Sequence, residues 1–299
     1  MLTFLRYNST VNKCEFWSIA IMNKNIHGSV GDAPAHTIYN KEGIFKICLG
    51  VISLIFAVFI GIFFGTSFNS KDMYFETTSG LYILGGGIAA AIAAVVVLSL
   101  ILRVKLAPTK RKTTTLLQYF GGVTLFLLFL QSIIDKNFWI VVFSLVAIAY
   151  FIGLFNKHYI ANTVFGVGAV LFYGAAIAQT YFDYSIAVNS PYKLLCQIGM
   201  AISMLLIASE LKFDLGGGNS GAYKLTSALT FILNISASTA SLTLIASDSR
   251  NIIYCLTPCT AMAIYSAKIF FARPSAPIET HDTQTTPDEK GTDTDEDVN

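Results

Sequence analysis

Charged residues are scarce in this sequence. They make up 13% of the 299 residues, whereas hydrophobic residues make up 54% and the mean hydropathy is +0.60. A water-soluble domain of this length carries about twice that share of charge, so the scarcity excludes a water-soluble globule. The hydrophobic residues are gathered in blocks of about twenty with almost no Asp, Glu, Lys or Arg inside them. That is the length a helix needs to cross the hydrocarbon of a membrane.

Ionisable side chains are missing from the middle of every block. Lys46, Glu210 and Lys268 come nearest, and each lies close enough to a block end for its side chain to reach water. This absence argues against a proton relay, a voltage sensor and an intramembrane aspartyl or metalloprotease, because each needs an ionisable or metal-binding group inside the membrane. We expect the chain to lack an ionisable coupling group of its own.

Motifs for enzymatic chemistry are also missing. The sequence GNSGA at 218–222 lacks the Gly-x-Ser-x-Gly spacing, and all four histidines lie outside the blocks, so Ser220 has no evident base. The GGG runs at 85–87 and 216–218 follow no strand and have no P-loop lysine, which indicates helix packing for the first and a turn for the second. We expect no catalytic centre, no cofactor and no nucleic-acid partner.

The apolar blocks predict an all-α integral membrane protein, a bundle of about eight transmembrane helices within residues 44–272. The blocks are 44–64, 82–102, 115–134, 138–155, 160–180, 194–209, 225–247 and 252–272. Because 138–155 and 194–209 are short, a re-entrant hairpin in place of two spans is an alternative.

The basic residues predict the orientation. Arg103, Lys105, Lys110, Arg111 and Lys112 lie between the second and third blocks, and such a cluster stays on the cytoplasmic side. With eight spans, both termini are then cytoplasmic, and 16 of the 20 Lys and Arg residues lie inside. Dropping one span would destroy this bias for every later loop. We therefore expect a multi-pass protein of the plasma (cytoplasmic) membrane.

The two ends of the chain differ from the membrane body. Residues 273–299 hold eight of the eighteen acidic residues and only two basic ones, a net charge of −6, with too few apolar residues to fold. We expect a disordered acidic cytoplasmic tail, or alternatively a tail that docks on a basic protein partner. Residues 1–43 are expected to form a flexible or interfacial cytoplasmic arm.

An apolar stretch within that arm, Phe16–Met22, is too short to span and lacks the order of a signal peptide, so we expect no cleaved leader. The stretch could lie along the membrane surface. Alternatively, translation begins at Met22, and residues 1–21 are not part of the native protein.

Small residues predict close helix packing along two stripes. The first stripe consists of Ser53, Ala57, Gly61 and Gly65, and the second of Gly86, Ala90 and Ala94. We expect both to pack within the chain, with a dimer interface as the alternative.

Hydroxyl and amide side chains are concentrated in the block 225–247, where they fall on two opposite faces of a helix. Such a helix is expected to lie centrally in the bundle. The next block contains a proline in mid-helix, and kinked helices beside polar ones often hold the substrate sites of transporters. The candidate cavity-lining residues are Ser227, Thr230, Asn234, Ser238, Ser241, Thr257 and Pro258. The alternative is that these groups only hold helices together.

Sulfur-containing residues allow one further hypothesis. None of the five cysteines lies in a predicted extracellular loop, so no disulfide framework is expected. Two helix faces would form a soft Cu(I) site if they met, although ordinary packing of these side chains is the expected role. One face carries Cys196, Met200 and Met204, and the other carries Cys255, Cys259 and Met262.

Two functional hypotheses follow. The first is a small-molecule transporter or permease component, with the blocks 225–247 and 252–272 lining the path. The second is a non-catalytic membrane scaffold or subunit that anchors partner proteins through the acidic tail or the small-residue faces. Transport is the preferred prediction, and a membrane-embedded lipid enzyme has the least support. The lipid bilayer is a partner in every case.

Overall fold

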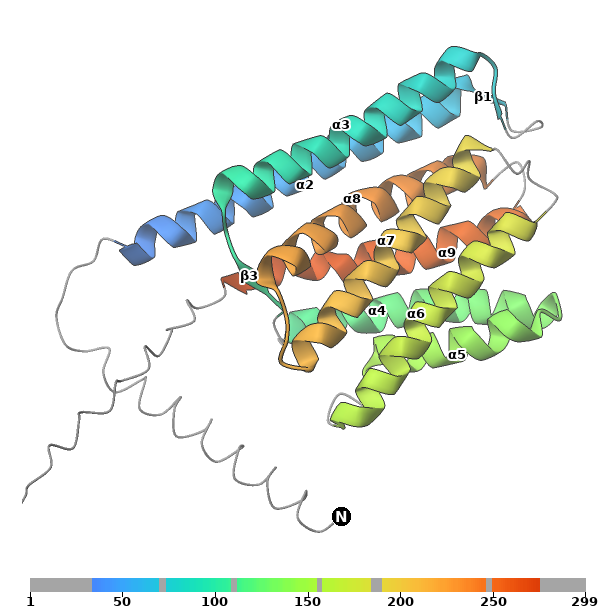
Figure 1. Ribbon diagram of the computed structural model, residues 1–299. Helices are drawn as coiled ribbons and strands as arrows, with labels where there is room; N and C mark the ends of the chain where they lie inside the picture. Colours follow the sequence, from blue (N-terminus) through green and yellow to red (C-terminus); the bar gives the residue numbers. More distant parts are fainter. Residues whose placement is uncertain are drawn as a thin grey trace, which may run out of the picture. The chain divides into compact units, whose positions relative to one another are not determined.

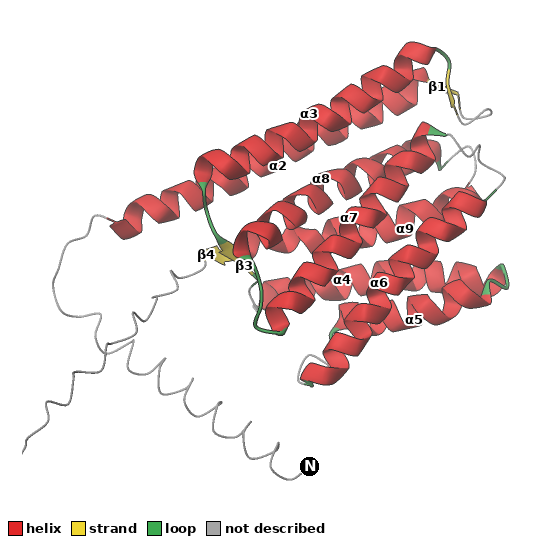
Figure 2. Ribbon diagram, in the orientation of Figure 1, coloured by secondary structure: helices red, strands yellow, loops and turns green. Residues whose placement is uncertain are grey.

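The computed structural model describes residues 34–69, 74–108, 112–154, 158–183, 190–245 and 249–274, and this part of the chain is all-helical (Figures 1 and 2). Its helices are α2 (Pro34–Ser67), α3 (Thr78–Leu102), α4 (Lys112–Ile134), α5 (Phe138–Ile152), α6 (Tyr159–Phe182), α7 (Pro191–Asp214), α8 (Ser220–Leu244) and α9 (Ser249–Ser266), which continues into the 3-10 helix η1 (Ala267–Phe271). The chain divides into two units, Met1–Ile44 and Phe45–Asn299, and the first contributes only the start of α2 to the described residues.

Two short antiparallel ribbons connect these helices. β1 (Phe68–Asn69) pairs with β2 (Tyr74–Phe75) between α2 and α3. β3 (Leu106–Ala107), which follows α3, pairs with β4 (Arg273–Pro274), which follows η1. The second ribbon therefore joins the start and the end of the segment that contains α4 to α9.

Within the described residues, seven helices are long and apolar enough to cross a membrane. The prediction of an all-α, multi-pass membrane protein is therefore confirmed at this level. Each of the eight predicted blocks corresponds to one helix. The exception in length is α5, whose 15 residues extend about 22 Å, less than the hydrocarbon thickness of a typical bilayer.

Several helices begin before or end after the apolar blocks that predicted them. α2 begins at Pro34, inside the predicted arm, and α7 runs to Asp214. Hydropathy marks only the part of a helix that matches hydrocarbon, whereas backbone hydrogen bonds continue into polar sequence. The rest of the predicted arm, residues 1–33, and of the predicted tail, residues 275–299, lies outside the described residues.

The helices α4 to α9 form a closed ring, in which each helix packs against the next and α9 packs against α4 (Figure 1). α9 also contacts α6 and α7, and it is the most buried of the seven spans, followed by α8. α8 is flanked by α7, α9 and α3. The central position predicted for the most polar block is therefore confirmed.

The small-residue stripe of α2 packs within the chain, as predicted. Ser53 and Ala57 are buried, and a Cβ on Gly61 would lie 3.0 Å from Thr239 Cγ2 of α8. This close approach lets α2 lie against the polar helix, because glycine leaves no side chain between the two backbones. The contact ends before Gly65, where an added Cβ would meet nothing within 4 Å.

The prediction that the stripe of α3 packs within the chain is wrong for Gly86 and Ala90, and the alternative of a dimer interface stays a prediction. Gly86 and Ala90 are exposed, whereas the buried face of α3 contains Leu84, Ala91 and Val95. Large side chains thus fill the contact between α3 and its neighbours, and the smooth stripe faces away from them. A stripe of small residues does not by itself identify the face of a helix that packs against protein.

The closest approach of α5 to α6 leads to a testable prediction. A Cβ on Gly168 of α6 would lie 2.2 Å from Val146 Cγ1 of α5, and a β-branched side chain has few rotamers with which to make room. We expect Gly168→Ala to lower the free energy of unfolding by about 1–3 kcal/mol, measured by denaturant titration in mixed micelles. Val146→Ala in the same chain should restore most of it. Gly85→Ala is the matched control, because its Cβ would meet nothing within 4 Å. Equal stabilities of the two alanine variants would contradict the tight contact.

Candidate functional site

Asn234, the candidate with the largest hydrogen-bonding capacity, lies fully buried between α7 and α8. Its Nδ2, which carries two hydrogens, lies within hydrogen-bonding distance of three acceptors: the carbonyl oxygen of Gly199 at 3.1 Å, Ser203 Oγ at 3.0 Å and the carbonyl oxygen of Thr230 at 2.9 Å. Gly199 permits this contact, because a Cβ there would lie 3.2 Å from Asn234 Oδ1. The amide therefore ties α8 to α7.

The other candidates also lie at helix contacts. Ser238 Oγ of α8 accepts a hydrogen bond from Thr260 Oγ1 of α9 at 3.1 Å, and Ser241 Oγ lies 2.9 Å from the Tyr192 hydroxyl of α7. Thr230 Oγ1 donates to the carbonyl oxygen of Ile202 at 3.3 Å, and Thr257 Oγ1 donates to that of Ile253. The Pro258 carbonyl oxygen accepts a hydrogen bond from the Tyr173 hydroxyl at 3.2 Å. Ser227 is buried in the first half of α8.

All seven candidates are buried, and none of them lines the cavity described below. Five of them, Thr230, Asn234, Ser238, Ser241 and Pro258, make contacts that hold helices together. Thr257 bonds within α9. Their role in lining a solute path stays a prediction.

The predicted sulfur faces do approach each other. Cys259 Sγ of α9 lies 3.9 Å from the carbonyl oxygen of Cys196 in α7, and Met200 and Met262 are fully buried. Within the described ranges, however, no group of three or more His, Cys, Asp or Glu residues is placed to hold a metal ion. The contact supplies packing, and a Cu(I) site that also uses the methionine sulfurs stays a prediction.

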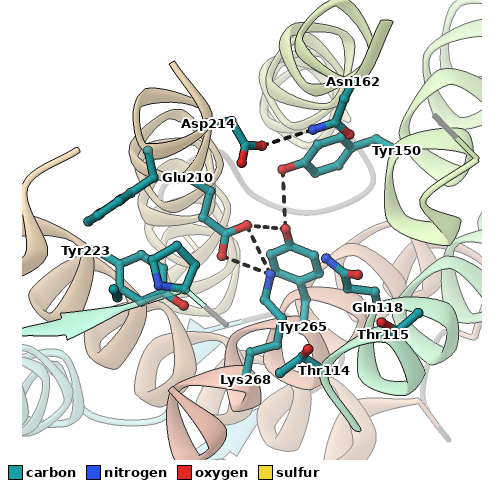
Figure 3. A pocket seen from close by; sticks show the side chains of 13 residues that line it. Thr114, Thr115, Gln118, Tyr150, Asn162, Glu210, Asp214, Tyr223, Tyr265 and Lys268 are labelled. Atoms are coloured by element: carbon teal, nitrogen blue, oxygen red, sulfur yellow. Dashed lines mark hydrogen bonds and ion pairs between the residues drawn. The ribbon is translucent and has the colours of Figure 1, made fainter. Parts of the chain in front are cut away.

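A polar cavity of about 460 Å³ lies at the end of the ring where α4, α6 and α8 begin and α5, α7 and α9 end (Figure 3). It is lined by Ala107, Pro108, Thr114, Thr115, Gln118, Tyr150, Asn162, Glu210, Phe213, Asp214, Tyr223, Tyr265 and Lys268. Every helix of the ring therefore contributes to its wall. The β3 strand contributes as well.

The cavity wall contains a buried ion pair. Lys268 Nζ of η1 lies 2.9 Å from Oε1 and 3.0 Å from Oε2 of Glu210 in α7, and the two side chains are only 8% and 9% exposed. The Tyr265 hydroxyl donates to Glu210 Oε2, and the Lys268 ammonium lies 3.5 Å from the centre of the Tyr265 ring. The prediction that these two charged side chains reach water is therefore wrong, because each meets its partner inside the bundle.

Further hydrogen bonds connect the cavity wall across helices. The hydroxyls of Tyr150 in α5 and Tyr265 in α9 lie 3.3 Å apart, and Asn162 Nδ2 of α6 donates to Asp214 Oδ2 of α7 at 3.0 Å. Figure 3 shows these groups around one space. The arrangement holds donors and acceptors at fixed positions, which is what recognition of a small polar molecule requires.

A partial signal for this site is present in the sequence. Glu210 and Lys268 are 58 residues apart, so no local spacing joins them. They do carry opposite charges at ends of two blocks that were assigned to the same membrane side, and that coincidence could have suggested a pair. The tyrosines carry no such signal, because aromatic residues at block ends also form ordinary interfacial belts.

Comparison of the chain with protein-family models, with curated proteins and with solved structures found no match. The fold and the site define a multi-pass α-helical membrane protein with a polar cavity at one end of a six-helix ring.

Proposed function

We propose that the chain is a small-molecule transporter or permease component of the plasma membrane, with the cavity at the end of the ring as its solute-binding site. The observation that supports this most is the Glu210–Lys268 pair in the cavity wall. Burying two charges is costly, and ionisable groups inside membrane bundles commonly serve substrates or ions. The cavity also has the size of a small-molecule site.

An orientation with both termini of the chain in the cytoplasm is part of this proposal. Lys46 Nζ, near the start of the apolar span Lys41–Ser67 of α2, donates to the carbonyl oxygen of Ala272 at 2.8 Å, so the chain enters and leaves the spans at one end. Thr114 in the first turn of α4 and Tyr150 at the end of α5 line the same cavity. The short α5 therefore makes the return crossing, which favours eight crossings. The basic cluster beside β3 favours a cytoplasmic location for this end.

The ion pair also changes the expectation about energy coupling. The sequence alone predicted no ionisable coupling group. Glu210 and Lys268 supply one acidic and one basic group at the proposed solute site, and these are the kinds of group that coupled transporters use.

Uptake into proteoliposomes tests the proposal. The full chain, reconstituted in lipid vesicles, is expected to accumulate one or more labelled small polar solutes above the level of empty vesicles. Gln118→Trp should abolish that uptake, because Gln118 lines the cavity and the indole ring would fill part of it. Leu116→Trp is the matched control, since Leu116 is 54% exposed on the same helix and lies outside the lining.

Two outcomes would contradict the proposal. Equal uptake by the Gln118→Trp and Leu116→Trp variants would indicate that the solute path does not pass through the cavity and would favour a path along the polar face of α8. Absence of uptake by the folded wild-type chain would favour a non-catalytic scaffold. In that case, deleting residues 275–299 should release a protein partner bound to the acidic tail.

A further inference from the structure

We propose that the cavity selects solutes that carry one positive and one negative group close together, as free amino acids do. This inference rests on the proposed function, since it assigns the solute class of the same cavity.

The ion pair carries the inference because both of its charges belong to the cavity wall. Each Glu210 oxygen lies within 3.0 Å of the Lys268 ammonium, so a solute that contacts either group competes with the internal pair. A solute with only a carboxylate would take Lys268 and leave Glu210 buried without a cation. A solute with only an ammonium that takes Glu210 would break the ion pair of Lys268 and leave Asp214, which is hydrogen-bonded to Asn162, as the remaining carboxylate in the cavity lining. Either outcome carries the large penalty of an uncompensated buried charge.

A zwitterion avoids this penalty at both ends. Its carboxylate can pair with Lys268 while its ammonium pairs with Glu210, so the internal pair opens and no charge is left alone. A neutral solute gains nothing from the pair, because it cannot replace either charge. The pair therefore selects solutes by their charge pattern, in addition to the selection by size that the cavity makes.

The groups next to the pair fit both ends of such a solute. The Tyr265 ring already holds an ammonium over its face, with Lys268 Nζ 3.5 Å from the ring centre, and a solute ammonium can use the same kind of contact. The Tyr150 hydroxyl, 3.3 Å from that of Tyr265, can donate to a carboxylate, while the Tyr265 hydroxyl keeps its hydrogen bond to Glu210. Phe213 and Tyr223 in the lining offer apolar surface for a side chain.

Other buried lysines of the chain are used differently. Lys224 Nζ donates to the carbonyl oxygen of Ser99 at 2.9 Å, and Lys193 Nζ donates to those of Tyr181 and Asp183 at 3.2 and 2.7 Å. Both lysines hold the carboxyl ends of neighbouring helices, where the helix dipole favours a cation, and neither lines the cavity. They provide buried-lysine controls for the experiment below.

Thermal unfolding of the purified full chain in nanodiscs tests the charge pattern. Each probe is a matched trio: leucine, its methyl ester, which is only cationic, and N-acetylleucine, which is only anionic, with glycine and glutamine trios alongside. We expect at least one free amino acid to raise the Tm, because a ligand that binds only the folded state stabilises it. The ester and the acetyl derivative of that amino acid should leave the Tm unchanged at the same concentration.

Single substitutions in the pair should then change the preferred charge. In Glu210→Gln, Lys268 is left without its anion, so the acetyl derivative should give the largest Tm shift. In Lys268→Gln, the methyl ester should give it. Lys224→Gln should keep the preference of the wild type. If the two pair variants fail to fold, the wild-type trios still decide, since equal shifts within a trio, or no shift with any free amino acid, would overturn the inference.

The same trios in proteoliposomes separate this inference from the proposed function. A free amino acid that stabilises the chain but is not taken up would overturn transport and leave the solute class standing. Uptake of only singly charged or neutral solutes would overturn the solute class and leave transport standing.

Discussion

Replacing Lys268 by methionine is expected to lower the free energy of unfolding by about 3–5 kcal/mol. Methionine keeps most of the buried volume of the side chain but leaves the Glu210 carboxylate, only 9% exposed, without a cation. The Tyr265 hydroxyl alone would remain to stabilise it. Equilibrium unfolding in mixed micelles measures the loss, with helix content as the signal.

The double variant Glu210→Gln with Lys268→Met separates the charge from the packing. It should be more stable than either single variant, because no charge is then buried alone, and the difference gives the coupling energy of the pair. Lys212→Met is the matched control, since Lys212 is exposed near the end of α7 and should change stability by no more than about 0.5 kcal/mol. A loss in Lys268→Met no larger than in this control would show that water reaches the pair.

The second large effect is expected at Asn234. Asn234→Leu removes the two N–H donors that two acceptors on α7 and one on α8 share. It should cost about 1–3 kcal/mol, because polar contacts in membrane bundles are individually weak. Ser236→Ala is the control in the same helix, because the Ser236 hydroxyl bonds only the carbonyl oxygen of Ile232 in the described contacts. Its effect should be far smaller.

Uptake by the Asn234→Leu variant, normalised to folded protein, distinguishes the two interpretations of α8. A role in packing predicts lower stability with uptake per folded molecule retained. Unchanged stability with uptake lost would instead support the candidates identified from the sequence, and it would place Asn234 on the solute path.

The helices could be predicted from the sequence because length and hydropathy are local properties. Each apolar block became one helix, and the two-sided polarity of 225–247 correctly placed α8 between neighbours. The boundaries were less predictable, because α2 continues through polar residues to Pro34. The face of α3 that meets protein was predicted wrongly, since its burial depends on which side chains of α2 and α8 lie opposite.

The cavity could not be predicted in the same way because its wall is assembled from the ends of six helices. Glu210 and Lys268 each look like a charge that marks the end of a span, and only the ring brings them together. The candidates predicted from the sequence are instead mostly hydrogen-bonding residues within the spans. In a membrane helix such residues often bond to their own backbone or to the next helix, as Ser241 does with Ala237 and Tyr192.

The ribbon of β3 and β4 has a consequence for how the ring is connected. Leu106 pairs with Pro274 and Ala107 with Arg273, so the segment that contains six helices begins and ends at one point. Segments whose two ends lie close together tolerate circular permutation, because a short linker can join the old ends without moving the helices. The positions of the six helices in space therefore do not depend on where the segment starts. A new start at the α4–α5 turn would preserve every contact among these six helices.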